Sequence, residues 1–112
     1  MTDIDYNRNR VEIDGESATV PGSIEDVVEI NGIVVVLFEP KEIGENSRNV
    51  WGFDQGGKKQ WIIDPAVMPT GKSYRYTGIE KNENELRVYN WKGGEYNINP
   101  NTGEIRDSTF TK

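Results

Sequence analysis

The sequence is rich in β-branched residues and poor in the residues that best form helices. Ile and Val together account for 21 of the 112 residues, whereas Ala and Leu together account for 4. β-Branched side chains lose rotamer freedom in a helix but pack well on the pleated surface of a sheet. A chain of this length forms one domain more readily than two. We therefore expect a single all-β domain over residues 1–112.

The sequence contains neither Cys nor His. It therefore has no thiol nucleophile, no imidazole proton shuttle at neutral pH and no Cys/His zinc site. Paired carboxylates could still act as general acid and base, but no motif fixes the separation that such a pair needs. The sequence also lacks a twelve-residue calcium loop and a phosphate-binding glycine loop. We expect a protein that is not an enzyme, with no catalytic residues, no metal and no cofactor.

The first residues do not resemble an export signal. They read Met-Thr-Asp-Ile-Asp and continue with polar side chains, whereas a secretory signal needs a basic stretch followed by an apolar run. The longest apolar run, residues 33–38, is too short to cross a bilayer. We expect a cytoplasmic protein that does not bind membranes.

Charge is distributed unevenly along the chain, whose formal net charge is -6. Residues 1–45 contain 11 acids and 3 bases, whereas residues 46–112 contain 8 acids and 10 bases. An acidic half repels nucleic-acid phosphates and attracts basic proteins. We therefore expect a basic protein partner and no direct binding of nucleic acid. Ordinary solubilising charge is the alternative interpretation.

Turn residues divide the sequence into short strands. Asn31-Gly32 lies between two apolar runs and is typical of a type I′ hairpin turn. Gly56 and Gly57 supply the backbone angles for a second hairpin turn. The continuous apolar run 33–38 predicts a strand that is buried on both faces.

Two segments near the N-terminus are less clearly defined by their pattern. Residues 23–28 fit either a short helix or a strand, and the strand is slightly favoured. Residues 9–20 add one or two strands, with a turn at residues 14–15.

Two groups of strands, residues 24–64 and residues 72–110, contain a similar succession of turns. Their spacing of about 45 to 52 residues, with four short strands in each group, matches one β-propeller blade. We expect about eight antiparallel strands in two blade-like units after an N-terminal strand segment; an unrelated barrel or sandwich is the alternative. Two blades cannot close a ring, so curvature, polar side chains, a dimer or a partner must cover their open faces.

Aromatic residues recur along the predicted strands. We expect Trp51, Trp61 and Trp91 to pack in the core. The tyrosines of residues 74–96 alternate along their strands, so some of them face outward. Tyr76 is the tyrosine that we expect to be exposed.

Two short motifs stand out, Asn-Val-Trp-Gly-Phe-Asp at residues 49–54 and Asn-Pro-Asn-Thr-Gly-Glu-Ile at residues 99–105. Together with the small acidic chain and the paired blade-like units, they resemble the half β-propeller immunity proteins of bacterial contact-dependent growth inhibition systems. This resemblance implies a cytoplasmic inhibitor that binds one toxin domain and blocks its active site. It further implies that the toxin is a basic, pancreatic-ribonuclease-like domain that cleaves RNA. The free inhibitor would be a monomer or a weak dimer.

Candidate partner-binding residues follow from the position of the acids. Three glutamates lie on the longest polar loop, and two further acids follow a Pro-Gly turn; both segments also fit plain solvated surface. The predicted partner-binding residues are Glu25, Asp26, Glu39, Glu42, Glu45, Asp54 and Tyr76. The alternative function is a non-catalytic β-rich adaptor or a domain that binds a small ligand or saccharide.

Overall fold

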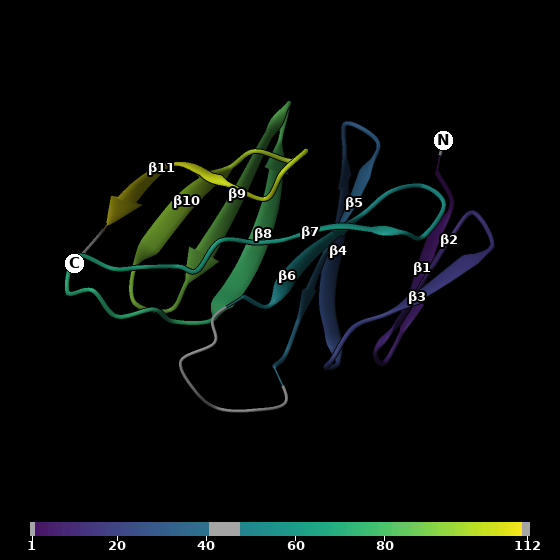
Figure 1. Ribbon diagram of the computed structural model, residues 1–112, viewed down its shortest axis with the longest axis horizontal. Helices are drawn as coiled ribbons and strands as arrows, with labels where there is room; N and C mark the ends of the chain where they lie inside the picture. Colours follow the sequence, from purple (N-terminus) through teal and green to yellow (C-terminus); the bar gives the residue numbers. More distant parts are fainter. Residues whose placement is uncertain (1, 41–47, 111–112) are drawn as a thin grey trace.

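The computed structural model describes residues 2–40 and 48–110, and every regular element in these residues is a β-strand. Eleven antiparallel strands form three separate open sheets that stand side by side (Figure 1). The all-β expectation is confirmed, and the alternative of a closed barrel is excluded. The second and third sheets together hold eight strands, as expected for the two units, and the first sheet brings the total to eleven. Over the same residues there is no helix long and apolar enough to span a bilayer.

The first sheet contains one strand more than the one or two that were expected near the N-terminus. Its strands are β1 (Ile4–Asn7), β2 (Arg10–Ile13) and β3 (Glu16–Thr19). The predicted turn at residues 14–15 joins β2 to β3. β1 escapes prediction because two of its four residues are polar or charged and face solvent, so it shows no apolar run.

The second sheet follows the chain order of its strands. These are β4 (Ile24–Ile30), β5 (Ile33–Phe38), β6 (Val50–Phe53) and β7 (Lys59–Ile62). Residues 24–28 belong to a strand, as the favoured interpretation predicted. Asn31 and Gly32 have φ angles of 51° and 78°, as the type I′ turn requires. In the second hairpin turn, Gly57 takes a positive φ of 80° and Gly56 does not.

The third sheet repeats this arrangement. Its strands are β8 (Tyr76–Asn82), β9 (Glu85–Asn90), β10 (Gly94–Ile98) and β11 (Ile105–Phe110). They lie in the order β11-β10-β9-β8, with β11 and β8 at the two edges. β4, the first strand of the second sheet, lies against β8, the first strand of the third.

The second sheet lies between the other two, and each of its faces is buried in a separate core. Val35 and Leu37 of β5 pack toward the third sheet, whereas Val34 and Val36 pack toward the first. All four side chains are almost fully buried. The apolar run of β5 is therefore continuous because this strand is covered on both faces, as predicted.

The outer faces of the first and third sheets are polar. Asp5 and Glu12 are paired across β1 and β2 on one end face. On the other, Arg87 forms ion pairs with Glu95 at 2.5 Å and with Glu85 at 3.3 Å. Polar side chains thus terminate the row of sheets, as capping repeats do in stacked repeat proteins. These faces need no apolar partner.

Trp61 connects the second sheet to a turn of the third. Its Nε1 donates a hydrogen bond to the carbonyl oxygen of Pro100 at 2.8 Å. A Cβ built on Gly52 would lie 2.3 Å from the Trp61 ring, and one on Gly103 would lie 2.6 Å from it. Both glycines belong to the motifs on which the family resemblance depends, so these motifs serve packing between the sheets.

Candidate functional site

Three of the predicted acidic residues lie at one end of the β4–β5 hairpin. Ile24 at the start of β4 is paired with Phe38 at the end of β5. This register brings Glu25 and Asp26 to the same end of the hairpin as Glu39, which directly follows β5. All three are exposed, and we call them the acidic edge. Glu42 and Glu45 lie outside the described residues.

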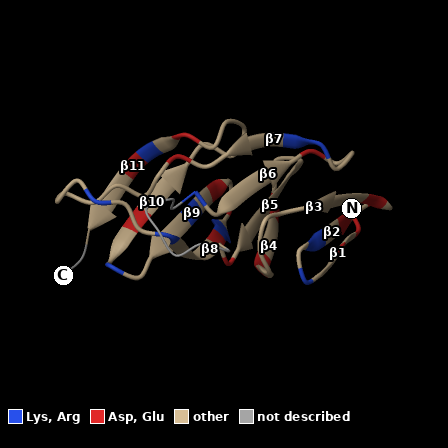
Figure 2. Cartoon of the chain, turned by 60° about the horizontal axis from the view of Figure 1, so that its bottom comes forward, with Lys and Arg blue, Asp and Glu red and all other residues tan. Residues whose placement is uncertain are grey.

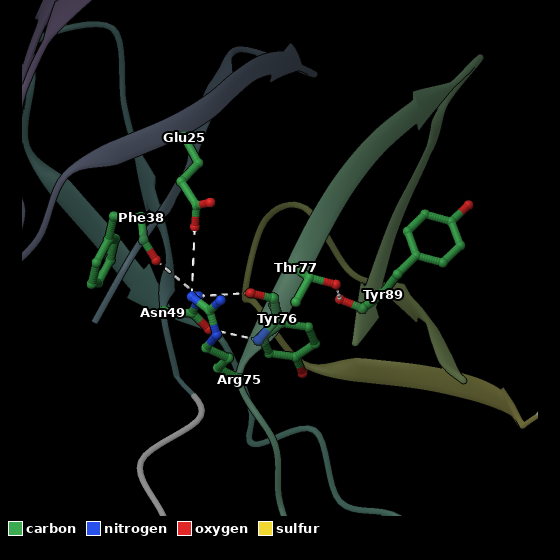
Figure 3. Close-up of polar contacts among 7 residues, drawn as sticks. All are labelled: Glu25, Phe38, Asn49, Arg75, Tyr76, Thr77 and Tyr89. Carbon is green, nitrogen blue, oxygen red and sulfur yellow. Dashed lines mark hydrogen bonds and ion pairs between the residues drawn. The ribbon is translucent and has the colours of Figure 1, made fainter. Parts of the chain in front are cut away.

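The carboxylates of the acidic edge have few partners within the described residues. Glu25 Oε1 lies 3.9 Å from Arg75 Nη1, and both side chains are more than 40% exposed (Figure 3). An exposed pair at this distance contributes little to stability. Asp26 Oδ1 accepts only a local hydrogen bond from the backbone of Val27. The acidic edge therefore presents carboxylates that are available to a partner.

A hollow of about 540 Å³ adjoins the acidic edge. Its lining includes the cationic side chain of Arg8, the turn at Gly22 and Ser23, and Glu39. The backbone of Glu39 donates to the carbonyl oxygen of Ser23 at 2.8 Å, which fixes the chain where it leaves β5. Glu39 is thereby held at the rim of the hollow.

Asp54 has a structural role in the turn between β6 and β7. Its Oδ1 accepts hydrogen bonds from the backbone N–H groups of Gly56 and Lys58, both at 2.9 Å. Its Oδ2 accepts a further bond from Gln60 at 3.0 Å. These bonds occupy both carboxylate oxygens within the turn. The structure does not place Asp54 with the acidic edge.

Tyr76 is fully buried, so the prediction that it is exposed is wrong. Its hydroxyl donates to the carbonyl oxygen of Asp64 at 2.7 Å, and burial raises the pKa of this hydroxyl. Its backbone N–H donates to Asn49 Oδ1 at 2.8 Å (Figure 3). Polar and aromatic residues alternate over residues 72–79 as expected, but the phase places Tyr76 inward, between the second and third sheets.

The prediction that Trp91 packs in the core is also wrong. It is 62% exposed, and its ring packs edge-on against Tyr74 with centroids 5.6 Å apart. Lys92 Nζ lies 4.3 Å from the centroid of the Trp91 ring, within the range of a cation–π contact. A signal was available, because Leu86 and Val88 alternate inward along β9 and this phase turns residue 91 outward.

Trp91 belongs to a group of apolar side chains at the surface, which we call the apolar strip: Val67, Tyr74, Trp91 and Phe110. Val67 is bridged to Ser73, the neighbour of Tyr74. The buried side chain of Tyr96 connects Phe110, the remaining member, to Val67. Its hydroxyl donates to the carbonyl oxygen of Val67 at 3.1 Å, and its ring packs against Phe110 with centroids 5.9 Å apart. The strip lies at one end of the third sheet.

A comparison with known protein families identifies the family to which the chain belongs. A family model described as "Domain of unknown function (DUF7957)" matches residues 1–110. The chain belongs to this family. A search of curated proteins finds no match.

Among solved structures, the DUF7957 chain is similar to the computationally designed Ika8 protein, with a TM-score of 0.60 and 12% sequence identity. The match covers 95% of this chain and 35% of the designed one, so the DUF7957 chain spans about a third of that protein's length. At this identity the likeness shows the fold alone.

The shifted pKa values in the DUF7957 domain move away from neutral pH. Tyr89 donates a hydrogen bond to Glu80 at 2.5 Å, which raises the pKa of Tyr89 to about 12. The pKa of Arg87 is raised by the hydrogen bonds of its guanidinium group to Glu95 and Glu85. The described residues also contain no group of three metal-ligating side chains.

Proposed function

We propose that this DUF7957 protein is a cytoplasmic immunity protein that binds a basic ribonuclease toxin domain and blocks its active site. It acts by occlusion and carries out no chemistry of its own. The observation that carries the proposal is the acidic edge, where three exposed acidic residues lie at the same end of one hairpin. The resemblance of the sequence to half β-propeller immunity proteins supplies the identity of the partner.

The chemistry of a ribonuclease explains why such an edge would inhibit it. An enzyme that binds RNA needs a cationic groove for the phosphates. Carboxylates that occupy this groove replace the phosphates and exclude the substrate. In the acidic edge, the ion pair to Arg75 is long and exposed, so little is lost when Glu25 turns to a new cation. The net charge of -6 adds long-range attraction for a basic partner.

The surrounding fold holds the acidic edge in place. Asn49 directly precedes β6, and its side chain bonds both to the carbonyl oxygen of Phe38 in β5 and to the backbone of Tyr76 in β8. These bonds fix the end of the β4–β5 hairpin relative to the third sheet. A surface that is ordered before binding loses less conformational entropy when the partner docks. The edge is therefore suited to rapid and tight association.

The test looks for a ribonuclease toxin domain encoded beside the gene for this protein and measures its inhibition; a gene neighbourhood without such a domain would count against the proposal. The toxin's ribonuclease activity is measured with increasing amounts of the wild-type chain, and we expect complete inhibition at equimolar ratio. A toxin that retains full activity in the presence of excess wild-type protein would overturn the proposed function.

Charge reversal then tests whether the acidic edge is the binding surface. The variant Glu25→Lys, Asp26→Lys, Glu39→Lys is compared with a control of equal charge change, Glu16→Lys, Glu104→Lys, Asp107→Lys. Association rates are measured over a range of salt concentrations. We expect the edge variant to bind more slowly than the control and to lose most of its salt dependence. Equal rates for both variants would remove the acidic edge from the interface.

A further inference from the structure

We propose that the hollow beside the acidic edge binds a small zwitterion, a free α-amino acid, whose carboxylate meets Arg8 and whose ammonium group meets Glu39. The hollow has a volume of about 540 Å³, and both residues belong to its lining. Small-molecule sites in proteins have volumes of about 300 to 1,000 Å³. The hollow is therefore large enough for such a ligand.

One wall of the hollow is the turn between β1 and β2, which hydrogen bonds hold against the segment between β3 and β4. The carbonyl oxygen of Arg8 accepts a hydrogen bond from the Ile24 N–H at 2.6 Å. The carbonyl oxygen of Asn9 accepts from the Val20 N–H at 2.9 Å, and Asn9 Nδ2 donates to the Val20 carbonyl oxygen at 3.3 Å. A site that is ordered before binding loses less conformational entropy when its ligand arrives.

Gly22 brings the second charged residue to the hollow. A Cβ built on Gly22 would overlap the carbonyl oxygen of Glu39, so no side chain fits at this position. The hydrogen bond from the Glu39 N–H to the carbonyl oxygen of Ser23 fixes the same contact. Glu39 therefore lines the hollow in which Arg8 also lies.

Arg8 and Glu39 carry opposite charges that are not paired with a neighbour. Over residues 2–40 and 48–110, neither side chain forms an ion pair, whereas the nearby Arg10 is paired with Glu12 at 3.2 Å. Both Arg8 and Glu39 are exposed. Figure 2 shows the turn between β1 and β2, which carries Arg8, in blue. Each of the two charges is thus available to a ligand.

The combination of these charges selects the class of ligand. A simple anion would be attracted by Arg8 but repelled by Glu39 and by the net charge of -6. A simple cation would be attracted by Glu39 but repelled by Arg8. A ligand that carries both charges finds a complementary group for each of them. An α-amino acid is the smallest common metabolite of this kind.

The turn at Gly22 and Ser23 offers further donors to the ligand carboxylate. Gly22 is buried and lines the hollow. Within the described part of the chain, its N–H has no acceptor, and the hydroxyl of Ser23 makes no hydrogen bond. A buried backbone N–H without an acceptor is rare in native proteins. Hydrogen bonds from these groups to a carboxylate are charge-assisted and therefore stronger than neutral ones.

The test follows the amide signals of Gly22 and Ser23 by two-dimensional NMR as an amino acid is added to the wild-type chain. Glycine, L-valine, L-glutamine and L-arginine are each added up to about 10 mM, where millimolar dissociation constants are measurable. We expect at least one of them to give saturable shifts at both signals. Acetate and methylammonium, which each carry only one of the two charges, should give none. No response to any of the four amino acids, or an equal response to acetate, would overturn the proposal.

Substitutions then test the roles of the two charged residues. Arg8→Gln and Glu39→Gln should each raise the dissociation constant of the bound amino acid at least about tenfold. The matched controls are Arg106→Gln and Glu104→Gln, at exposed positions outside the hollow, which should leave it unchanged. The spectra also report whether each variant is folded. Equal effects of site and control variants would contradict the assignment. No toxin enters these experiments, so their outcome is independent of the proposed function.

Discussion

Replacement of Asn49 by Ala should destabilise the protein more than any other single polar substitution between the sheets. The Asn49 side chain is 1% exposed. Its Nδ2 donates to the carbonyl oxygens of Phe38 at 2.8 Å and Tyr76 at 2.9 Å, and its Oδ1 accepts from the Tyr76 N–H at 2.8 Å. The two bonds that Nδ2 donates contribute about 1 kcal/mol each net, and the buried Tyr76 N–H left without a partner costs about 1 to 3 kcal/mol more. We therefore expect a loss of about 3 to 5 kcal/mol.

Urea denaturation followed by tryptophan fluorescence measures this loss as a shift of the midpoint at constant slope. The control is Asn82→Ala, at an exposed position of β8, which should change the free energy of unfolding by less than about 0.5 kcal/mol. If Asn49→Ala costs less than about 1 kcal/mol, the three hydrogen bonds do not hold the second sheet to the third, and the argument for an ordered acidic edge fails.

Three further predictions concern other contacts. Gly103→Ala should lower the melting temperature, because its Cβ would lie 2.6 Å from the Trp61 ring at a φ of 77°; Gly78→Ala, with its nearest neighbour at 3.7 Å, should leave it almost unchanged. Trp61→Ala should cost about 3 to 5 kcal/mol in urea denaturation, and a smaller loss than about 1 kcal/mol would contradict its packing role. Tyr89 has a folded pKa raised to about 12 from 10.0, so its hydrogen bond to Glu80 stabilises the fold fully below pH 10 and loses this contribution as the pH rises through 12. Ultraviolet titration of Tyr89→Phe should show one ionisation near pH 12 fewer than the wild type, and an unchanged curve would refute the assignment.

Local chemistry explains which parts of the fold were predictable. The Asn31-Gly32 turn depends only on two residues that tolerate positive φ, so the sequence predicts it directly. The burial of β5 on both faces was also predictable, because an unbroken apolar run leaves no polar face. The strand β1 was not, since its stability comes from pairing with β2 rather than from its own residues.

The site was less predictable, because it depends on contacts between distant segments. The sequence places Glu25 and Glu39 on separate segments, and only the register of β4 against β5 brings them together. The ion pair of Glu25 with Arg75 joins two different sheets and has no local signal. Tyr76 was expected at the surface and is buried, whereas Trp91 was expected in the core and is exposed. Alternation along a strand predicts which residues share a face of the sheet, but it does not predict which face is covered.

Amide hydrogen exchange, compared for the wild-type chain alone and in complex with the neighbouring toxin domain, would report most directly how this protein acts. The proposed mechanism predicts new protection at residues 24–27 and 39–40, with little change on the outer face of the first sheet. Protection centred on the outer sheet faces, with none around the end of the β4–β5 hairpin, would contradict it.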